Sequence, residues 1–122
     1  MIHKTSIVNP KAKISNNVEI GPYCTIGPEV EIGANSILHS HVNIEGNTKI
    51  GKNNQIYPFS SIGTPPQDLK YKGEKNSLIV GDNVLIGGGS GVIKNIPSNT
   101  KVMGYPARNI RNFLKENKYN ND

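Results

Sequence analysis

The stretch IGPYCTIGPEVEIGANSILHSH, residues 20–41, repeats an aliphatic residue at every sixth position. Neither common secondary structure has this period, because a helix repeats near 3.6 residues and a strand repeats at about 2. The register extends in both directions and holds only Ile, Val or Leu: Ile2, Val8, Ile14, Ile20, Ile26, Ile32, Leu38, Ile44, Ile50, Ile56 and Ile62. Ordinary amphipathic strands would show period 2 and would lose phase at each turn. The pattern therefore predicts a solenoid.

Hexapeptide repeats are a sequence signature of β-helices. Six residues form one short strand and a turn, and three such units form a triangular coil of about 18 residues. The register residues would then point into the prism and stack in columns. A narrow corner of the prism requires small residues, and these stand two positions before the register: Ser6, Ala12, Cys24, Ser36, Thr48 and Ser60.

The turns between the strands have a recurrent composition. Glycine follows the register residue at Gly21, Gly27, Gly33, Gly51 and Gly63, and asparagine stands three places after it at Asn17, Asn35, Asn47 and Asn53. Both residue types tolerate left-handed backbone conformations. We therefore expect left-handed turn residues at both sets of positions.

The bulk composition agrees with a solenoid and indicates the cellular compartment in which the protein is expected. The chain has 122 residues, is 34% hydrophobic and has no Trp, so a globular core would be thin. The one cysteine, Cys24, excludes an internal disulfide and is expected to be a buried, reduced thiol. Neither a signal peptide nor a membrane-spanning run is visible, so a cytoplasmic protein is expected.

The net charge of +5 favours acidic partners such as phosphates, a nucleotide or an acidic carrier protein. Plain solubility is the alternative explanation. The basic residues are scattered and match no recognition motif, which argues against nucleic-acid binding.

The register fails after Gly63, in the segment TPPQDLKYKGEKNS at residues 64–77. Asp68 and Glu74 occupy register positions there, and burying them unpaired would cost several kcal/mol. The register resumes at Val80, one full coil after Ile62, so two sides of that coil are expected to be replaced by a loop that leaves the prism. Long loops inside compact repeats are usually functional, although a tolerated insertion is the alternative.

The C-terminal segment has a different pattern. Pro97 and Pro106 end regular strand pairing, and Pro106 suits the first turn of a helix. Within residues 107–118, Ile110, Phe113 and Leu114 form one apolar stripe among basic residues. We expect a β-helix over residues 1–104, followed at 105–122 by a helix and tail that cap the open end or pack on a neighbouring subunit.

Residues 1–84, and above all the loop motif QDLKYKGE at residues 67–74, resemble the N-terminal half of the UDP-N-acetylglucosamine O-acyltransferases of lipid A biosynthesis. The resemblance implies an all-β fold, a left-handed parallel β-helix, assembled as a homotrimer with active sites between neighbouring subunits. It also implies transfer of a hydroxyacyl chain from acyl carrier protein to the sugar 3-hydroxyl, with no permanently bound cofactor.

The sequence departs from this family in its second half. Family members are much longer, and the segment resembling AHDC that carries their histidine base has no counterpart after residue 41. The segment IGGGSGVIKNIPSNTKVMGYPAR, residues 86–108, instead resembles the closing coil of hexapeptide acetyltransferases and of the related lipid A N-acyltransferase.

The resemblance also suggests binding residues. Gln67, Asp68 and Lys70 match loop positions that contact the nucleotide sugar, with a merely solvated loop as the alternative. Donor-binding candidates are two glycines, which would admit a pantetheine arm, and three basic residues where related enzymes meet coenzyme A phosphates: Gly87, Gly89, Lys94, Lys101 and Arg108. Tight solenoid corners and a solvated basic end are the alternatives.

Histidines are the ready general bases near neutral pH. His39 and His41 occupy outward positions after Leu38, and surface or trimer-contact roles are the alternative for both. If either is catalytic, we expect His41, which would face a groove between subunits. His3 lies near the N-terminus and is expected to have no role, and no metal site is expected.

Three functions remain open from the sequence. The first is an acyltransferase that acts on a nucleotide-linked amino sugar and uses a pantetheine thioester, carried by acyl carrier protein or coenzyme A. The second is a small sugar N-acetyltransferase that uses acetyl-CoA, because a sugar amine needs less activation than a hydroxyl. The third is a truncated, non-catalytic trimer that binds nucleotide sugar.

Overall fold

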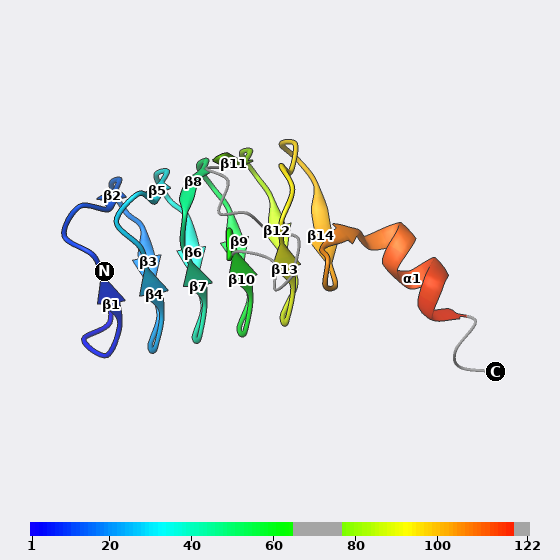
Figure 1. Cartoon of the computed structure of the whole chain (residues 1–122), viewed down its shortest axis with the longest axis horizontal. Coiled ribbons are helices and arrows are strands. Elements are labelled where there is room, and N and C mark those ends of the chain that lie inside the picture. The colour runs from blue at the N-terminus through cyan, green and yellow to red at the C-terminus, as the bar shows by residue number, and fades with distance from the viewer. Residues whose placement is uncertain (65–76, 119–122) are drawn as a thin grey trace, which may run out of the picture.

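The chain winds into a three-sided prism of short parallel strands (Figure 1). The structure is a computed structural model, and it describes residues 1–64 and 77–118, with side chains as far as Lys115. Face 1 consists of β1 (Ile7–Val8), β4 (Thr25–Ile26), β7 (Asn43–Ile44), β10 (Ser61–Ile62) and β13 (Gly91–Val92). Face 2 consists of β2 (Lys13–Ile14), β5 (Glu31–Ile32), β8 (Asn47–Ile50) and β11 (Ser77–Val80). Face 3 consists of β3 (Glu19–Ile20), β6 (Ile37–Leu38), β9 (Gln55–Ile56), β12 (Leu85–Ile86), β14 (Lys101–Met103) and the antiparallel β15 (Arg108–Asn109).

Parallel pairing follows the repeat. Ile7 pairs with Thr25 and Thr25 with Asn43, each one coil further along the chain. The last residue of nearly every strand points inward, and the register residues from Ile20 to Ile62 are at most 3% exposed. The fold is therefore a left-handed parallel β-helix, as the period and the resemblance predicted.

Four of the six small corner residues, Cys24, Ser36, Thr48 and Ser60, are buried and bond to backbone groups, whereas Ser6 and Ala12 are half-buried. Ser36 Oγ donates to the Gly51 carbonyl at 3.0 Å, one coil further on. Cys24 is 1% exposed, and its Sγ donates to the His39 carbonyl at 3.0 Å. The predictions of small corner residues and of a buried thiol are thus confirmed.

The turn prediction is only half right. Asn17, Asn35 and Asn53 do adopt left-handed conformations, with φ between 59° and 62°, but Asn47 belongs to β8. Of the five glycines that follow the register, only Gly63 has a positive φ. Close packing explains three of the others, Gly21, Gly33 and Gly51: a Cβ on Gly33, for example, would lie 2.6 Å from the Gly51 carbonyl carbon of the next coil.

The phase after the loop also differs from the prediction. Val80 pairs with Ile50 on face 2, rather than returning to face 1 above Ile62. Ile62 itself pairs with Val92, so each face regains its register after 30 residues instead of 18. The chain therefore inserts 12 extra residues at the corner between faces 1 and 2, and no side of a coil is replaced.

The C-terminal helix begins later than predicted. Residues Arg108–Asn109 form β15 against β14, and α1 spans Ile110–Lys118. Asn109 caps the helix, because its Oδ1 accepts a hydrogen bond from the Arg111 backbone N–H at 2.9 Å. Figure 1 shows α1 extending beyond the last coil along the long axis of the prism.

Candidate functional site on face 1

His41 lies at the corner where the chain passes from face 3 to face 1. Its φ is 57°, and its backbone is held by neighbouring coils: the His41 N–H donates to the Pro22 carbonyl at 3.0 Å, and its carbonyl accepts from Phe59 N–H at 3.0 Å. The left-handed conformation turns the side chain outward, and the imidazole is exposed. The corner thus presents a histidine on a rigid backbone.

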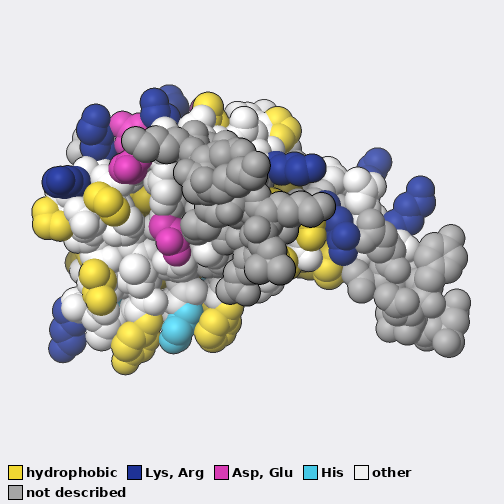
Figure 2. Space-filling model, in the orientation of Figure 1, with side chains coloured by type: hydrophobic (Ala, Val, Ile, Leu, Met, Phe, Trp, Pro, Cys, Tyr) yellow, Lys and Arg dark blue, Asp and Glu magenta, His cyan; other side chains and the backbone are white. Residues whose placement is uncertain are grey.

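Two aromatic rings flank this imidazole. The His41 ring centroid lies 5.1 Å from that of Tyr23 and 4.8 Å from that of Phe59, one coil to either side. Figure 2 shows a histidine between hydrophobic side chains along the lower edge of the molecule. Stacking covers the faces of the imidazole and leaves its edge, where the nitrogens are, toward solvent. This column of three rings is called the aromatic ladder below.

A polar cluster lies on face 1 beside the ladder. Asn43 Nδ2 donates to Glu45 Oε1 at 2.6 Å and to Thr64 Oγ1 at 3.4 Å. The Ser61 hydroxyl is also hydrogen-bonded to the Thr64 hydroxyl. These four half-buried side chains connect β7 and β10 to the start of the inserted segment. Sequence reasoning missed them, although Asn43 and Ser61 occupy the same outward position one coil apart.

The inserted segment leaves the prism on the other side of face 1 from His41. It follows β10 and Thr64 and ends at Ser77, where β11 of face 2 begins. Face 1 is therefore bounded by the ladder on one edge and by the root of the insertion on the other. The predicted sugar-binding residues Gln67, Asp68 and Lys70 lie outside the described residues.

His39 has a different environment from His41. Its ring stacks on Tyr57 at 4.6 Å, and Nε2 is buried with no hydrogen-bond partner among the described residues. His39 Nε2 is therefore not accessible as a base. His3, the third histidine, pairs its Nδ1 with the Thr5 hydroxyl at 2.8 Å.

The two candidate donor-site glycines are not equivalent. Gly87 is buried, and a Cβ there would lie 2.9 Å from Met103 Cε, so Met103 occupies its open side. Gly89 is exposed with φ of 71°, and no heavy atom of the described residues lies within 4 Å of the corresponding Cβ position. Only Gly89 offers open backbone.

The three candidate donor-site cations lie on different parts of the last coils. Lys94 follows β13 of face 1, whereas Lys101 begins β14 of face 3. Arg108 is half-buried in β15, with its guanidinium carbon 5.7 Å from the centre of the Phe113 ring. They share one end of the solenoid but form no single cluster.

Charge is nevertheless segregated toward that end. Residues 93–115 contain five basic residues and no acidic one: Lys94, Lys101, Arg108, Arg111 and Lys115. Residues 116–118 add one acidic and one basic residue, and the remaining described residues, 1–64 and 77–92, have five basic and five acidic residues. Figure 2 shows basic side chains along the end that carries α1. The positive charge of the described chain thus belongs to its C-terminal end.

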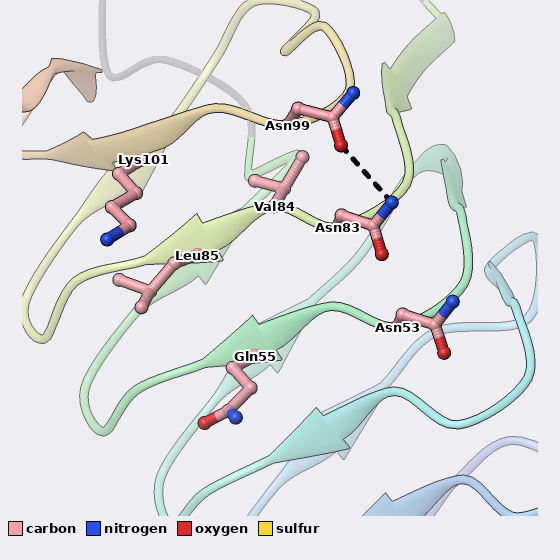
Figure 3. Close-up of a pocket in the computed structure, with 7 residues that line it drawn as sticks. All are labelled: Asn53, Gln55, Asn83, Val84, Leu85, Asn99 and Lys101. Atoms are coloured by element: carbon pink, nitrogen blue, oxygen red, sulfur yellow. Dashed lines mark hydrogen bonds between the residues drawn. The ribbon is translucent and has the colours of Figure 1, made fainter.

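Lys101 also lines a shallow, open groove on face 3 (Figure 3). The groove has a volume of about 390 Å³ and is lined mainly by carboxamides: Asn53, Gln55, Asn83, Val84, Leu85, Asn99 and Lys101. Asn83 Nδ2 donates to Asn99 Oδ1 at 3.2 Å across one coil. The groove lies at the opposite edge of face 3 from the aromatic ladder.

The described residues contain neither a metal-binding cluster nor a membrane-spanning helix. No group of three or more His, Cys, Asp or Glu side chains there is placed to hold a metal ion. No helix in the described part is long and apolar enough to cross a membrane.

Comparison with known proteins agrees with this architecture. Residues 11–46 match the family described as bacterial transferase hexapeptide (six repeats). Over 85 residues, 70% of this chain, the sequence is 56% identical to the acyl-[acyl-carrier-protein]–UDP-N-acetylglucosamine O-acyltransferase of Thermodesulfovibrio yellowstonii. That match covers 33% of the relative, so the chain spans about a third of the length of the curated relatives it matches.

Solved structures give the same result. The UDP-N-acetylglucosamine acyltransferase of Bacteroides fragilis has a TM-score of 0.81 and 36% identity, over 85% of this chain and 44% of that chain. The corresponding enzyme of Francisella novicida has a TM-score of 0.80 and 38% identity, over 86% of this chain and 42% of that chain.

By repeat and by fold, the protein is a hexapeptide-repeat β-helix of the kind found in bacterial transferases. Within that class, its sequence is similar to the UDP-N-acetylglucosamine O-acyltransferases, as the loop motif had indicated.

Proposed function

We propose that this protein is an acyltransferase that acts on a nucleotide-linked amino sugar of the UDP-N-acetylglucosamine type. The observation that carries the proposal is the 56% identity over 85 residues with a relative named for this reaction. The acyl donor is a pantetheine thioester, and acyl carrier protein is the donor that the relative's name specifies.

The acceptor site lies on face 1, between the aromatic ladder and the inserted segment. Gln67, Asp68 and Lys70 bind the nucleotide sugar from that segment, and the polar cluster of Asn43, Glu45, Ser61 and Thr64 forms the floor beside it. The working assembly is a homotrimer, in which a neighbouring subunit closes the site over face 1. A single short prism leaves this polar face open to water, and cyclic association would cover it.

His41 acts as the general base. Its edge is exposed while Tyr23 and Phe59 hold its ring in place. It accepts the proton of the sugar hydroxyl as the hydroxyl oxygen forms a bond to the thioester carbonyl carbon. The carbon–sulfur bond then breaks, and the departing thiolate takes up a proton. Positioning of the two substrates supplies the rest of the acceleration.

The donor approaches from the C-terminal end of the solenoid. Lys94, Lys101 and Arg108 supply positive charge for the phosphate of the pantetheine carrier, and exposed Gly89 lets the thin arm approach the backbone. Residues 93–115 contain no acidic residue, whereas basic and acidic residues are equal in number in residues 1–64 and 77–92. This difference supports the C-terminal end as the side from which the donor approaches.

The test is an acyl-transfer assay with the purified chain, UDP-N-acetylglucosamine and a hydroxyacyl-loaded carrier protein. We expect ester formation in the wild type, a loss of kcat of about 10²-fold or more in His41→Ala, and none in His3→Ala. Asp68→Ala and Lys70→Ala should raise the KM for the sugar by roughly 10-fold with little change in melting temperature. Absence of transfer together with no binding of the nucleotide sugar at millimolar concentration would refute the proposal.

A further inference from the structure

The aromatic ladder is regular, and the same backbone conformation continues at the next coil of this corner. Tyr23, His41 and Phe59 occupy the same position on three successive coils, and all three have φ between 57° and 64°. Their rings lie about one coil apart, with centroids separated by 5.1 and 4.8 Å. The β-helix therefore sets a stacking distance suited to planar rings.

The next position in this column is Gly89. It keeps the left-handed conformation of the three ring-bearing residues, with φ of 71°, but carries no side chain. Among the described residues, no heavy atom lies within 4 Å of the place where a Cβ would stand. Phe59, the last ring of the ladder, is 68% exposed. The ladder thus ends at a vacant step with an open aromatic surface beneath it.

The neighbouring glycines show that the vacancy is local. The space beside Gly87 is taken by Met103, and the space beside Gly91 is taken by the Tyr105 ring. The chain fills these two positions with its own side chains and leaves Gly88 and Gly89 exposed. The open space is therefore confined to Gly88 and Gly89 within this turn.

The backbone around the vacant step has free hydrogen-bonding groups. Gly89 N–H donates to the Pro58 carbonyl at 2.9 Å. The Gly88 N–H and the carbonyls of Phe59 and Gly89 have no partner among the described residues. One donor and two acceptors on the residues of the vacant step are therefore free to bond to a ligand. Heterocyclic bases carry both donors and acceptors on their edges, whereas a simple phenyl ring carries none.

We propose that a nucleobase stacks on Phe59 at the Gly89 step and completes the aromatic ladder. The choice of nucleotides rests on the proposed function, with coenzyme A taken as the alternative pantetheine carrier to acyl carrier protein, and two sources of such a ring follow. One is the uracil of a uridine-linked sugar acceptor, and the other is the adenine of a coenzyme A donor. Base–aromatic stacking accounts for about 5- to 150-fold in affinity.

Calorimetric titration with UMP and, separately, with AMP tests the proposal and separates the two sources. We expect one of them to bind the wild type, and Phe59→Leu to weaken that binding by about 10-fold or more. Tyr23→Leu is the matched control, because Tyr23 is an exposed ring at the far end of the same ladder. It should change the affinity by less than about twofold.

A second variant fills the step from within. Gly89→Phe places a ring where the ligand ring would lie, and the three preceding coils already hold ring-bearing residues at nearly the same φ. We expect an unchanged circular dichroism spectrum and loss of nucleotide binding. Nucleotide binding that persists in a folded Gly89→Phe variant would overturn the proposal.

Other results also count against it. The proposal is wrong if Phe59→Leu binds as tightly as the wild type, if Tyr23→Leu loses as much affinity as Phe59→Leu, or if neither nucleotide binds at millimolar concentration. A change of molecular mass by light scattering in Phe59→Leu, without any nucleotide binding to the wild type, would assign the step to a subunit contact instead. Acyl transfer without UMP or AMP binding would refute this site alone, and ladder-dependent binding without acyl transfer would refute only the proposed reaction.

Discussion

At the scale of single residues, the two neighbouring residues of a strand lie in different environments: one points into the prism and the other points to solvent. Ile44, the inward residue of β7, is fully buried, whereas Ile7, the outward residue of β1 on the same face, is 71% exposed. An inward isoleucine therefore contributes more to the free energy of unfolding than an outward one. The position in the six-residue register decides whether a residue points inward or outward.

The first prediction tests that contrast. Ile44→Asp places a carboxylate in the dry column of the prism and should lower the free energy of unfolding by several kcal/mol, enough to unfold a marginal domain. Ile7→Asp places the same charge in solvent on the same face and should leave melting nearly unchanged. Thermal denaturation followed by circular dichroism compares the two, and equal melting temperatures would show that the register does not define the interior.

The second prediction concerns the corner glycines. Gly33→Ala forces a Cβ to within 2.6 Å of the Gly51 carbonyl carbon, and the nearest atoms are all backbone of Gly51 and Lys52, which leaves little room to adjust. Overpacking of this kind costs about 1–3 kcal/mol. Gly27→Ala is the control, because its Cβ would lie 3.4 Å from Glu45 Cα and neither glycine has a positive φ. A chemical denaturation series should show the loss in Gly33→Ala alone, and similar losses in both would contradict the packing explanation.

At the scale of elements, a buried carboxamide adds to the strand pairing that joins the coils before and after the insertion. Asn54 is fully buried; its Nδ2 donates to the Gly51 carbonyl at 3.2 Å and the Gly81 carbonyl at 2.9 Å, and its Oδ1 accepts from Val84 N–H at 2.7 Å. Gly81 and Val84 belong to the coil that follows the insertion. The side chain therefore aligns two coils that the chain itself connects only through the inserted segment.

The third prediction follows from this arrangement. Asn54→Ala leaves the Val84 N–H and the Gly81 carbonyl buried without this partner, at a cost of about 1–3 kcal/mol for each unsatisfied group. Asn16→Ala, at an exposed position whose side chain has no hydrogen bond to the described residues, should change stability by less than about 0.5 kcal/mol. Urea unfolding measures both, and a neutral Asn54→Ala would mean that the coils are aligned by strand pairing alone.

The same elements show what sequence could predict. The inward column from Ile20 to Ile62 was predictable, because a six-residue period reports burial directly. The face on which Val80 lies was not predictable from the sequence. An insertion of two six-residue units keeps the aliphatic residues in phase, so the period cannot show which face the chain returns to. The outward residues Asn43, Glu45, Ser61 and Thr64 were also missed, since the period constrains only what points inward. Tyr23, His41 and Phe59 stand one coil apart, and that spacing was the available signal for the ladder.

At the scale of the whole molecule, charge and shape are arranged along one axis. The N-terminal coils balance their charges, in part through Glu31, which pairs with Lys13 and Lys49 at 3.5 Å each on face 2. The C-terminal end carries five basic residues from 93 to 115 without an acidic one, and α1 extends from it with Leu114 59% exposed. An acidic partner would therefore meet the molecule at this end.

The last prediction tests this uneven distribution of charge along the molecule. Arg111→Glu combined with Lys115→Glu reverses two exposed charges on α1 and should raise the KM for an acidic acyl-carrier-protein donor by roughly 10-fold, while the KM for the sugar stays unchanged. Lys4→Glu combined with Lys11→Glu makes the same change in net charge at the opposite end and should have little effect. The wild-type donor KM should also rise with salt, because exposed charges are screened within about 10 Å at 0.1 M ionic strength. Equal effects of the two double variants would mean that the donor responds to net charge and not to the C-terminal end.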